Sequence, residues 1–321
     1  MKDELLAAWV ATCLALACAP RPAPPVPDSV EVDAERRLQY GEASALMLEY
    51  WSRAADVTSR VRIAGAELCG DKIRAALGIV ALSNEDLPRL FGQRGFWRQF
   101  RVVFEEAQGI TDRVRVLHVA PRAPADAAGL RAGDIVVSLA GRPVRDAGHL
   151  AILQSEQLEA TYEMEVSRAG SARTLTIDRV AECWYDLAIT VAAFPNAFAD
   201  GRIIYATTGL LRTVESDDEL ALVIGHELAH NVLGHSVKSF KRSEQEADYL
   251  GCYFAALAGY DVAQASPYWR RVAREFPVLV SENASYAHSG TATRAAALAR
   301  TVEEIRDKLR VGAPLVPNAS P

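Results

Sequence analysis

The chain has 321 residues, half of them hydrophobic, and its 41 acidic and 35 basic residues give a net charge of −6. This length allows two domains, each with its own hydrophobic core. The negative charge and the absence of basic runs in the sequence exclude nucleic acid and acidic membrane surfaces as main partners.

The N-terminal sequence is typical of an export signal. Leu5 to Ala17 form an apolar run that is too short to span about 30 Å of hydrocarbon but long enough for a signal-peptide core. Cys18 and the prolines after it resemble a bacterial lipoprotein cleavage site followed by a stiff tether. We predict a signal peptide at 1–18 and a Pro-rich linker at 19–32, with Cys18 as the candidate lipid anchor to the membrane. Simple secretion and an uncleaved anchor are the alternatives.

A long amphipathic helix is expected next. Between residues 33 and 62, apolar side chains recur at helical spacing with charges between them. We expect this helix to pack on the domain that ends the chain.

Residues 123 to 139 have the pattern of a short helix, a turn and a strand. Pro124 can start the helix, because proline at the first helical position loses no hydrogen bond, and Gly129 can end it in a left-handed conformation. Gly133 and Asp134 then predict a turn into an apolar strand.

The elements after this strand complete a module. The spacing predicts a helix over 146–156 and a hairpin of 161–166 with 172–177. Together with the preceding helix and turn, this pattern resembles a PDZ domain, which we expect at 71–180 as an insertion. The partner that this resemblance implies is a C-terminal peptide.

Leu77-Gly78-Ile79 resembles the carboxylate-binding loop of PDZ domains. In such a loop, backbone N–H groups hold a peptide terminus and the next strand pairs with the peptide. An ordinary apolar strand is the alternative. Residues 83–110 are more than a minimal PDZ domain requires at this point.

Two cysteines, Cys69 and Cys183, flank this module almost symmetrically. A disulfide between them would clamp the base of the insertion and close a long loop. Two buried free thiols are the alternative. No pair of cysteines has CxxC spacing, so the cysteines are poor candidates for zinc ligands.

The sequence HELAH, from His226 to His230, has the HExxH order of zinc peptidases. Residues four apart lie one turn apart on one helical face, so both imidazoles can reach one ion while Glu227 projects beside them. Ser216 predicts the N-cap of this helix, and Gly234 predicts its end.

A third ligand is required. His235 would supply it in an HExxHxxGxxH pattern, but the glycine and histidine have the wrong offsets, so we interpret His235 as a solvated residue after the helix. Ser243 and Glu246 predict the capping box of another helix. On that helix Glu244 and Asp248 lie one turn apart, so Glu244 can be the ligand while Asp248 accepts an N–H from a ligand histidine. An ordinary acidic helix start is the alternative.

These motifs resemble the gluzincin family that includes HtpX and the CAAX prenyl protease, together with soluble periplasmic and lipoprotein members. The resemblance covers residues 31–69 loosely and 183–300 well, including a strand and turn at 196–211 and the ExxAD segment at 244–248. It implies one Zn²⁺ per chain and catalysis by Glu227. It also implies that His288 and Arg294 approach the metal site, although the proline that often follows the late histidine is replaced by Ser289.

The strand that contains Ile203, Ile204 and Tyr205 is a candidate binding surface for substrate. If this strand is exposed beside the cleft, it could pair with the main chain of an extended polypeptide. An ordinary core strand is the alternative.

The expected fold class is α+β, with a mainly helical gluzincin metallopeptidase core and a small sheet, interrupted by the β-rich PDZ domain. The peptidase domain would comprise 33–70 and 181–310, and 311–321 would be a disordered tail.

The function that these predictions imply is that of a zinc-dependent metalloendopeptidase. It would act on unfolded or extended polypeptide substrates in the periplasm or cell envelope, either as a free protein or as an outer-membrane lipoprotein, with the PDZ domain for substrate capture or regulation. A catalytically weak PDZ scaffold or chaperone-like envelope protein is the alternative. A purely structural zinc is disfavoured, because structural sites usually fill the fourth position with a protein ligand.

Overall fold

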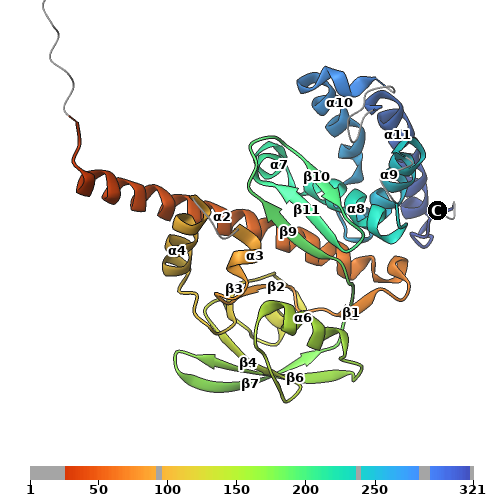
Figure 1. The fold of residues 1–321 in the computed structure, drawn as a ribbon. Coiled ribbons are helices and arrows are strands. Elements are labelled where there is room, and N and C mark those ends of the chain that lie inside the picture. The colour runs from red at the N-terminus through yellow and green to blue at the C-terminus, as the bar shows by residue number, and fades with distance from the viewer. Residues whose placement is uncertain (1–25, 92–95, 236–239, 282–289, 319–321) are drawn as a thin grey trace, which may run out of the picture. The chain divides into compact units, whose positions relative to one another are not determined.

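The computed structural model describes residues 26–91, 96–235, 240–281 and 290–318. The predicted signal peptide, Cys18 and His288 therefore lie outside the described residues. The chain divides into two compact units, Met1–Gln39 and Tyr40–Pro321. The second unit combines helices and sheets, which confirms the α+β prediction (Figure 1). None of the described helices combines the length and the apolar character needed to cross a membrane.

The PDZ-like part of the chain is an antiparallel sheet in the order β2-β3-β4-β6-β7, with β5 paired to β4. Its buried side chains include Leu139, Met164 and Ile177, which form a core of their own. The helix predicted over 146–156 and the hairpin predicted for 161–166 with 172–177 are both confirmed. The bounds are β2 (Ile79–Leu82), β3 (Arg115–Val119), α5 (Pro124–Ala127), β4 (Ile135–Leu139), β5 (Arg142–Pro143), α6 (Ala147–Ser155), β6 (Thr161–Arg168) and β7 (Ser171–Asp178).

The turn before β4 is held by a buried carboxylate. Asp134 is 1% exposed and accepts hydrogen bonds from Nε and Nη2 of Arg168, both at 2.7 Å, and from the Arg131 amide at 2.9 Å. Burial alone would raise the pKa of Asp134, but these three donors outweigh it and lower the pKa below its usual value. The predicted turn is therefore fixed by charge-assisted hydrogen bonds as well as by Gly133.

A two-stranded ladder and a disulfide lie where the chain enters and leaves the PDZ-like part. Strand β1 (Ile73–Ala75) pairs antiparallel with β8 (Ala181–Cys183). The sulfur atoms of Cys69 and Cys183 are bonded, and their Cα atoms lie 5.6 Å apart, within the usual range for a disulfide. Cys69 ends the short helix η1 (Ala66–Cys69).

The C-terminal part of the chain forms a small sheet and a group of helices. The sheet has the order β10-β11-β9, with β9 and β11 parallel, and α8 contacts both β10 and β11 (Figure 1). Helix α9 packs on α8 and on α11. The bounds are β9 (Asp186–Thr190), β10 (Ala197–Ala199), β11 (Ile203–Thr207), α7 (Thr208–Thr213), α8 (Asp217–Val232), α9 (Phe240–Leu257), η2 (Val262–Gln264), α10 (Ala265–Glu275), η3 (Pro277–Val280) and α11 (Thr291–Val311).

Helix α2 (Ser29–Ala64) is the long helix that the apolar spacing predicts. The extra residues after β2 fold into α3 (Leu87–Phe91) and α4 (Phe96–Gln108), which pack on α2 through aromatic rings. Trp51 lies 5.9 Å from Phe91 and 5.6 Å from Phe104, measured between ring centroids. The residues that a minimal PDZ domain lacks therefore form α3 and α4, and these two helices connect the domain to α2.

Two predictions about local structure are wrong. Helix α9 begins at Phe240, so Ser243 lies inside the helix and does not cap it. Strand β11 lies between β10 and β9, so both of its edges are paired and it offers no free edge to a substrate. The apolar content of β11 reflects this central position, with Ile204 fully buried.

Candidate functional site

Helix α8 begins and ends where the sequence predicts. The Ser216 hydroxyl accepts a hydrogen bond from the Glu219 amide at 3.2 Å, which satisfies a donor of the first turn. Gly234 adopts a left-handed conformation after the last turn, and the next amide, that of His235, donates to the His230 carbonyl. The two motif histidines therefore lie in the C-terminal half of a well-bounded helix.

Helices α8 and α9 approach closely because glycines face each other. A Cβ atom on Gly225 would lie 2.5 Å from the Gly251 carbonyl oxygen, and one on Gly251 would lie 2.7 Å from the His226 amide nitrogen. Only residues without a side chain allow this approach, since the obstructing atoms are backbone. The close packing carries the acidic face of α9 onto the histidine face of α8.

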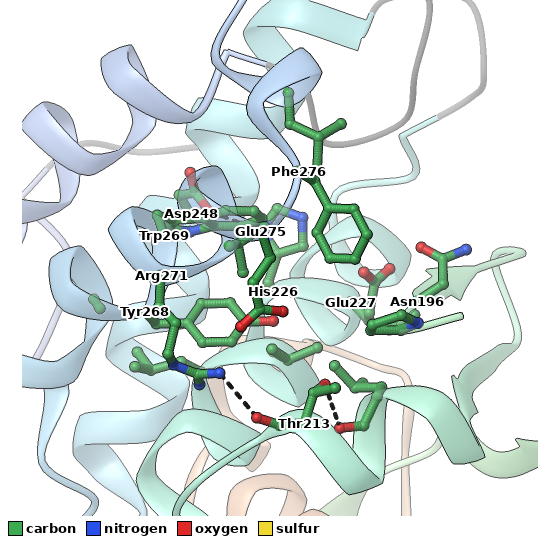
Figure 2. A pocket seen from close by; sticks show the side chains of 18 of the residues that line it. Asn196, Thr213, His226, Glu227, Asp248, Tyr268, Trp269, Arg271, Glu275 and Phe276 are labelled. Atoms are coloured by element: carbon green, nitrogen blue, oxygen red, sulfur yellow. Dashed lines mark hydrogen bonds and ion pairs between the residues drawn. The ribbon is translucent and has the colours of Figure 1, made fainter. Parts of the chain in front are cut away.

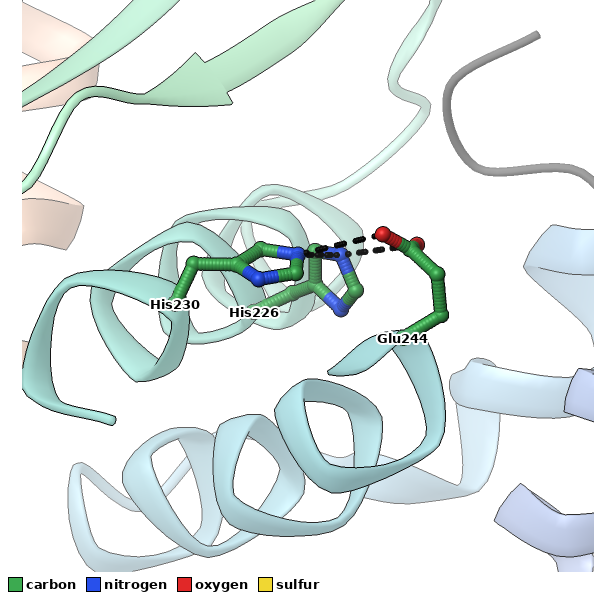
Figure 3. Close-up of side chains that lie close together, drawn as sticks. All are labelled: His226, His230 and Glu244. Atoms are coloured by element: carbon green, nitrogen blue, oxygen red, sulfur yellow. Dashed lines mark hydrogen bonds and ion pairs between the residues drawn. The ribbon is translucent and has the colours of Figure 1, made fainter. Parts of the chain in front are cut away.

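His226, His230 and Glu244 converge from these two helices, with their donor atoms within 4.8 Å of one another (Figure 3). The two Nε2 atoms are 3.0 Å apart. Glu244 places Oε2 3.4 Å from His226 Nε2 and Oε1 3.3 Å from His230 Nε2. The three side chains thus present their donor atoms to one point.

This donor set fits a zinc ion. Ligand atoms held about 2.0–2.1 Å from a tetrahedral zinc ion lie about 3.3 Å from one another, close to the three separations in the cluster. Two imidazoles and one carboxylate also match the ligand preference of zinc and leave a fourth position for water or substrate.

Asp248 contacts the ring of His226, and Arg294 holds Asp248 in place. Asp248 Oδ1 lies 2.9 Å from His226 Nδ1, so the other ring nitrogen of His226 faces Glu244. Arg294 donates to both oxygens of Asp248, at 2.7 and 2.6 Å, and its Nη1 lies 3.0 Å from Glu244 Oε2. The Arg294 guanidinium is therefore committed to these carboxylates, which makes it an orienting group rather than a donor to substrate.

The charges of this group shift the pKa values of its members. Burial would raise the pKa of Asp248, but the charge and hydrogen bonds of Arg294 lower it to about 2. Burial and Arg294 would lower the pKa of His226, but Asp248 and Glu244 outweigh them and raise it to about 9. Burial lowers the pKa of His230. The two carboxylates therefore favour the protonated form of His226, whereas burial favours the neutral form of His230.

The interpretation of His235 as a solvated residue is wrong. Its side chain is 12% exposed, its Nδ1 lies 2.9 Å from His230 Nδ1, and its Nε2 lies 3.2 Å from Glu246 Oε2. Glu246, predicted as part of a capping box, instead contacts this imidazole. His235 and Glu246 thus orient the ring of His230, much as Asp248 orients that of His226.

A cavity of about 340 Å³ borders the cluster at His226 and contains the buried side chain of Glu227 (Figure 2). Strand β10, the edge strand of the small sheet, begins at this cavity with Ala197, and Asn196 precedes it. Much of the remaining wall is apolar: Leu210, Leu222, Val272, Phe276, Leu279 and Leu298. The candidate base thus lies in a largely apolar cleft beside the donor atoms.

Sequence reasoning missed two aromatic residues of this cavity, Tyr268 and Trp269. The guanidinium carbon of Arg294 lies 3.7 Å from the Trp269 ring centroid, so the ring supports Arg294 by a cation–π contact. Tyr268 brings a hydroxyl group to the cavity that holds Glu227 (Figure 2). The sequence gives no motif for either residue, because both depend on how α10 packs.

The predicted peptide-binding loop lies in a second cavity. Leu77 is buried, Gly78 has a left-handed conformation with φ of +71°, and Ile79 begins β2. All three residues line this cavity. Leu77, Gly78 and Ile79 thus lie together, apart from the metal cluster.

Comparisons with known proteins agree with the two parts of the chain. Residues 172–243 match the model of peptidase family M48, and residues 115–163 match that of the PDZ domain. No curated protein matches the chain. A solved structure of the HtrA3 PDZ domain bound to a phage-derived ligand (FGRWV) is 22% identical, covers 34% of this chain and 88% of its own, and has a TM-score of 0.25. Residues 172–243 are thus similar to M48 peptidases and residues 115–163 to PDZ domains, in keeping with a peptidase whose chain is interrupted by a PDZ domain.

Proposed function

We propose that this chain is a zinc-dependent metalloendopeptidase that hydrolyses peptide bonds in unfolded or extended polypeptides of the cell envelope. The observation that carries the proposal is the convergence of His226, His230 and Glu244 at tetrahedral spacing beside the buried carboxylate of Glu227. The match to peptidase family M48 supports it, since that family is zinc-dependent in general.

The residues of the cluster have separable roles. His226, His230 and Glu244 would hold the ion, which would make a water molecule acidic at neutral pH and polarise the scissile carbonyl. Glu227 would accept the proton of the attacking water and deliver it to the leaving amine. Tyr268 offers a hydroxyl in the same cavity that can donate to the oxygen on which negative charge develops.

The PDZ domain would capture chain ends or exposed segments and deliver them or regulate cleavage. The match over residues 115–163 supports this role, as does the loop at Leu77 and Gly78, which opens into its own cavity. Extended substrates are favoured because the largely apolar active-site cavity lies at the start of the edge strand β10, which can pair with an extended main chain.

A location in the periplasm or cell envelope is the last part of the proposal, with Cys18 as a lipid anchor. The N-terminal apolar run supports export. The disulfide between Cys69 and Cys183 supports it independently, since structural disulfides persist in oxidising compartments and are rare in the cytosol.

Replacement of Glu227 tests the function. We expect Glu227→Gln to retain one zinc per chain, because Glu227 is not in the donor set, and to lower the rate of casein cleavage by about 10²–10⁴-fold. Metal content is measured by mass spectrometry, and cleavage by release of a fluorescent label. Glu275→Gln, which removes a carboxylate from the same cavity, is the matched control and should cleave at nearly the wild-type rate.

Two results would contradict the proposal. A wild-type protein without stoichiometric metal would remove the basis of the active site. Full biological activity of Glu227→Gln would favour the scaffold alternative over the peptidase.

A further inference from the structure

Trp269 on helix α10 lies between the active-site cavity and a buried arginine. Its side chain lines the cavity that holds Glu227, and its ring contacts the guanidinium group of Arg294. Arg294 is 2% exposed and is not among the residues that line the cavity. The Trp269 ring therefore separates one face of the guanidinium group from the contents of the cavity.

The edge of the Arg294 guanidinium group is used by carboxylates. Its Nε and Nη2 donate to Asp248 at 2.7 and 2.6 Å, and its Nη1 lies 3.0 Å from Glu244 Oε2. A guanidinium group is planar and donates hydrogen bonds only within its plane. The hydrogen bonds to these carboxylates therefore leave its two flat faces uncovered.

The Trp269 ring covers one of these faces. The guanidinium carbon of Arg294 lies 3.7 Å from the ring centroid, well within the limit of about 6 Å for a cation–π contact. Tryptophan is the strongest aromatic partner in such contacts, and the attraction grows where water is excluded. The ring thus restrains the plane of the guanidinium group, and with it the direction of every N–H donor.

The contact reaches the zinc ligands through two carboxylates. Asp248, which accepts two hydrogen bonds from Arg294, lies 2.9 Å from Nδ1 of His226. Glu244, which belongs to the donor set, also contacts Arg294. A tilt of the guanidinium group would therefore shift both carboxylates at once. Water at its open face would also weaken these ion pairs, because charges attract each other less strongly at a higher dielectric constant.

We propose that Trp269 is a positioning residue of the zinc site, which acts through Arg294 and Asp248 on the ring of His226. The inference rests on the proposed function and deepens it, because it gives a role in the metal site to a residue outside the donor set. A residue that served only as a wall of the cavity would need no more than an apolar side chain. A positioning residue needs the flat aromatic face.

Two replacements in the full-length protein separate these roles. Trp269→Leu keeps an apolar wall without an aromatic face, and Trp269→Phe keeps an aromatic face. Zinc affinity is measured by competition with a chromophoric chelator. We expect Trp269→Leu to weaken zinc binding by about three- to thirtyfold, the upper limit being full transmission of a desolvated cation–π contact. Trp269→Phe should weaken it by less than about threefold.

Proton exchange checks the same role without the ion. In protein stripped of metal, the imidazole proton that His226 Nδ1 shares with Asp248 is followed by NMR and assigned by its shift in Asp248→Asn. A loosened carboxylate opens more often and exposes this proton to solvent. Exchange should therefore be at least about threefold faster in Trp269→Leu and nearly unchanged in Trp269→Phe.

Phe276→Leu is the matched control, since it removes another aromatic ring from the same cavity. Figure 2 shows Phe276 on the side of Glu227, whereas Trp269 lies next to Asp248. This variant should bind zinc and exchange the His226 proton as the wild type does. Melting temperatures show whether each variant is folded.

The inference is overturned if either measurement is unchanged in Trp269→Leu, or if Trp269→Phe changes as much as Trp269→Leu. Neither measurement requires turnover. A wild-type protein that binds zinc but cleaves no casein would therefore contradict the proposed function alone. For a protein that binds no zinc, the exchange of the His226 proton still decides whether Trp269 positions this group.

Discussion

Asp248 controls how the ring of His226 is presented, since it accepts from Nδ1 while Nε2 faces Glu244. Asp248→Asn keeps the shape but removes the charge that fixes the ring. We expect zinc affinity to fall by about 10–100-fold, measured by competition with a chromophoric chelator. Asp307→Asn, on an exposed part of α11, should bind zinc as the wild type does. Equal affinities of the two variants would show that Asp248 has no orienting role.

The pH dependence of stability provides a separate test in the PDZ domain. Because the folded-state pKa of Asp134 lies below its unfolded value of about 3.9, its ion pair stabilises the fold above that pH and is lost as the pH falls through the folded-state pKa. At pH 7 we expect Asp134→Asn to lower the free energy of unfolding by about 1.5–3 kcal/mol. Urea unfolding at pH 7 and pH 3 should show this difference shrinking at the lower pH. A difference that stays constant would contradict the assignment.

The sequence predicted some residues of the site and missed others for a physical reason. His226, Glu227 and His230 share one helix, and Glu244 and Asp248 share another, so helical spacing alone places each group on one face. The contact between His235 and Glu246 depends on where α8 ends and how α9 crosses it. No local pattern encodes such a contact, and the same holds for Tyr268.

At the scale of elements, the glycine contact between α8 and α9 decides whether the ligands meet. A methyl group on Gly251 would overlap backbone atoms of α8, which cannot rotate away, so Gly251→Ala should force the helices apart. We expect a loss of about 1–3 kcal/mol in the free energy of unfolding, together with weakened zinc binding. Urea unfolding and metal titration measure the two effects.

Gly41→Ala is the matched control for this prediction. Gly41 lies in helix α2 with nothing within 4 Å of the added Cβ atom. Alanine is the better helix former, so this variant should be as stable as the wild type or up to about 1 kcal/mol more stable. If both variants behave alike, the contact between the two helices does not position the ligands.

Some elements were predictable from the sequence and others were not. Alternating side chains predict β6, because one face of this strand is buried, and β7 pairs with it although β7 is mostly exposed. The sequence misplaces the start of α9 because Ser243 and Glu246 mimic a capping box, whereas the helix extends back to Phe240. The central position of β11 depends on its parallel pairing with β9. No local pattern in the sequence predicts this pairing, because the two strands are not adjacent along the chain.

At the scale of the whole molecule, the disulfide closes a loop of 114 residues that contains the PDZ domain. In the entropy model, such a loop contributes about 4–5 kcal/mol to the free energy of unfolding. We expect the Cys69→Ser/Cys183→Ser variant to unfold at a lower urea concentration than the oxidised wild type. Adding a reductant should shift the wild type to the midpoint of the variant and leave the variant unchanged. Identical midpoints of wild type and variant before reduction would contradict the stabilising role.

The ladder of β1 and β8 brings the two ends of the insertion side by side, with Ala75 opposite Ala181. A different domain whose two ends lie equally close could therefore replace the insertion at this ladder without moving the helices that carry the metal ligands. The exchange would still have one requirement. The replacement would have to shield the Trp51 side chain, which α3 and α4 now cover from solvent.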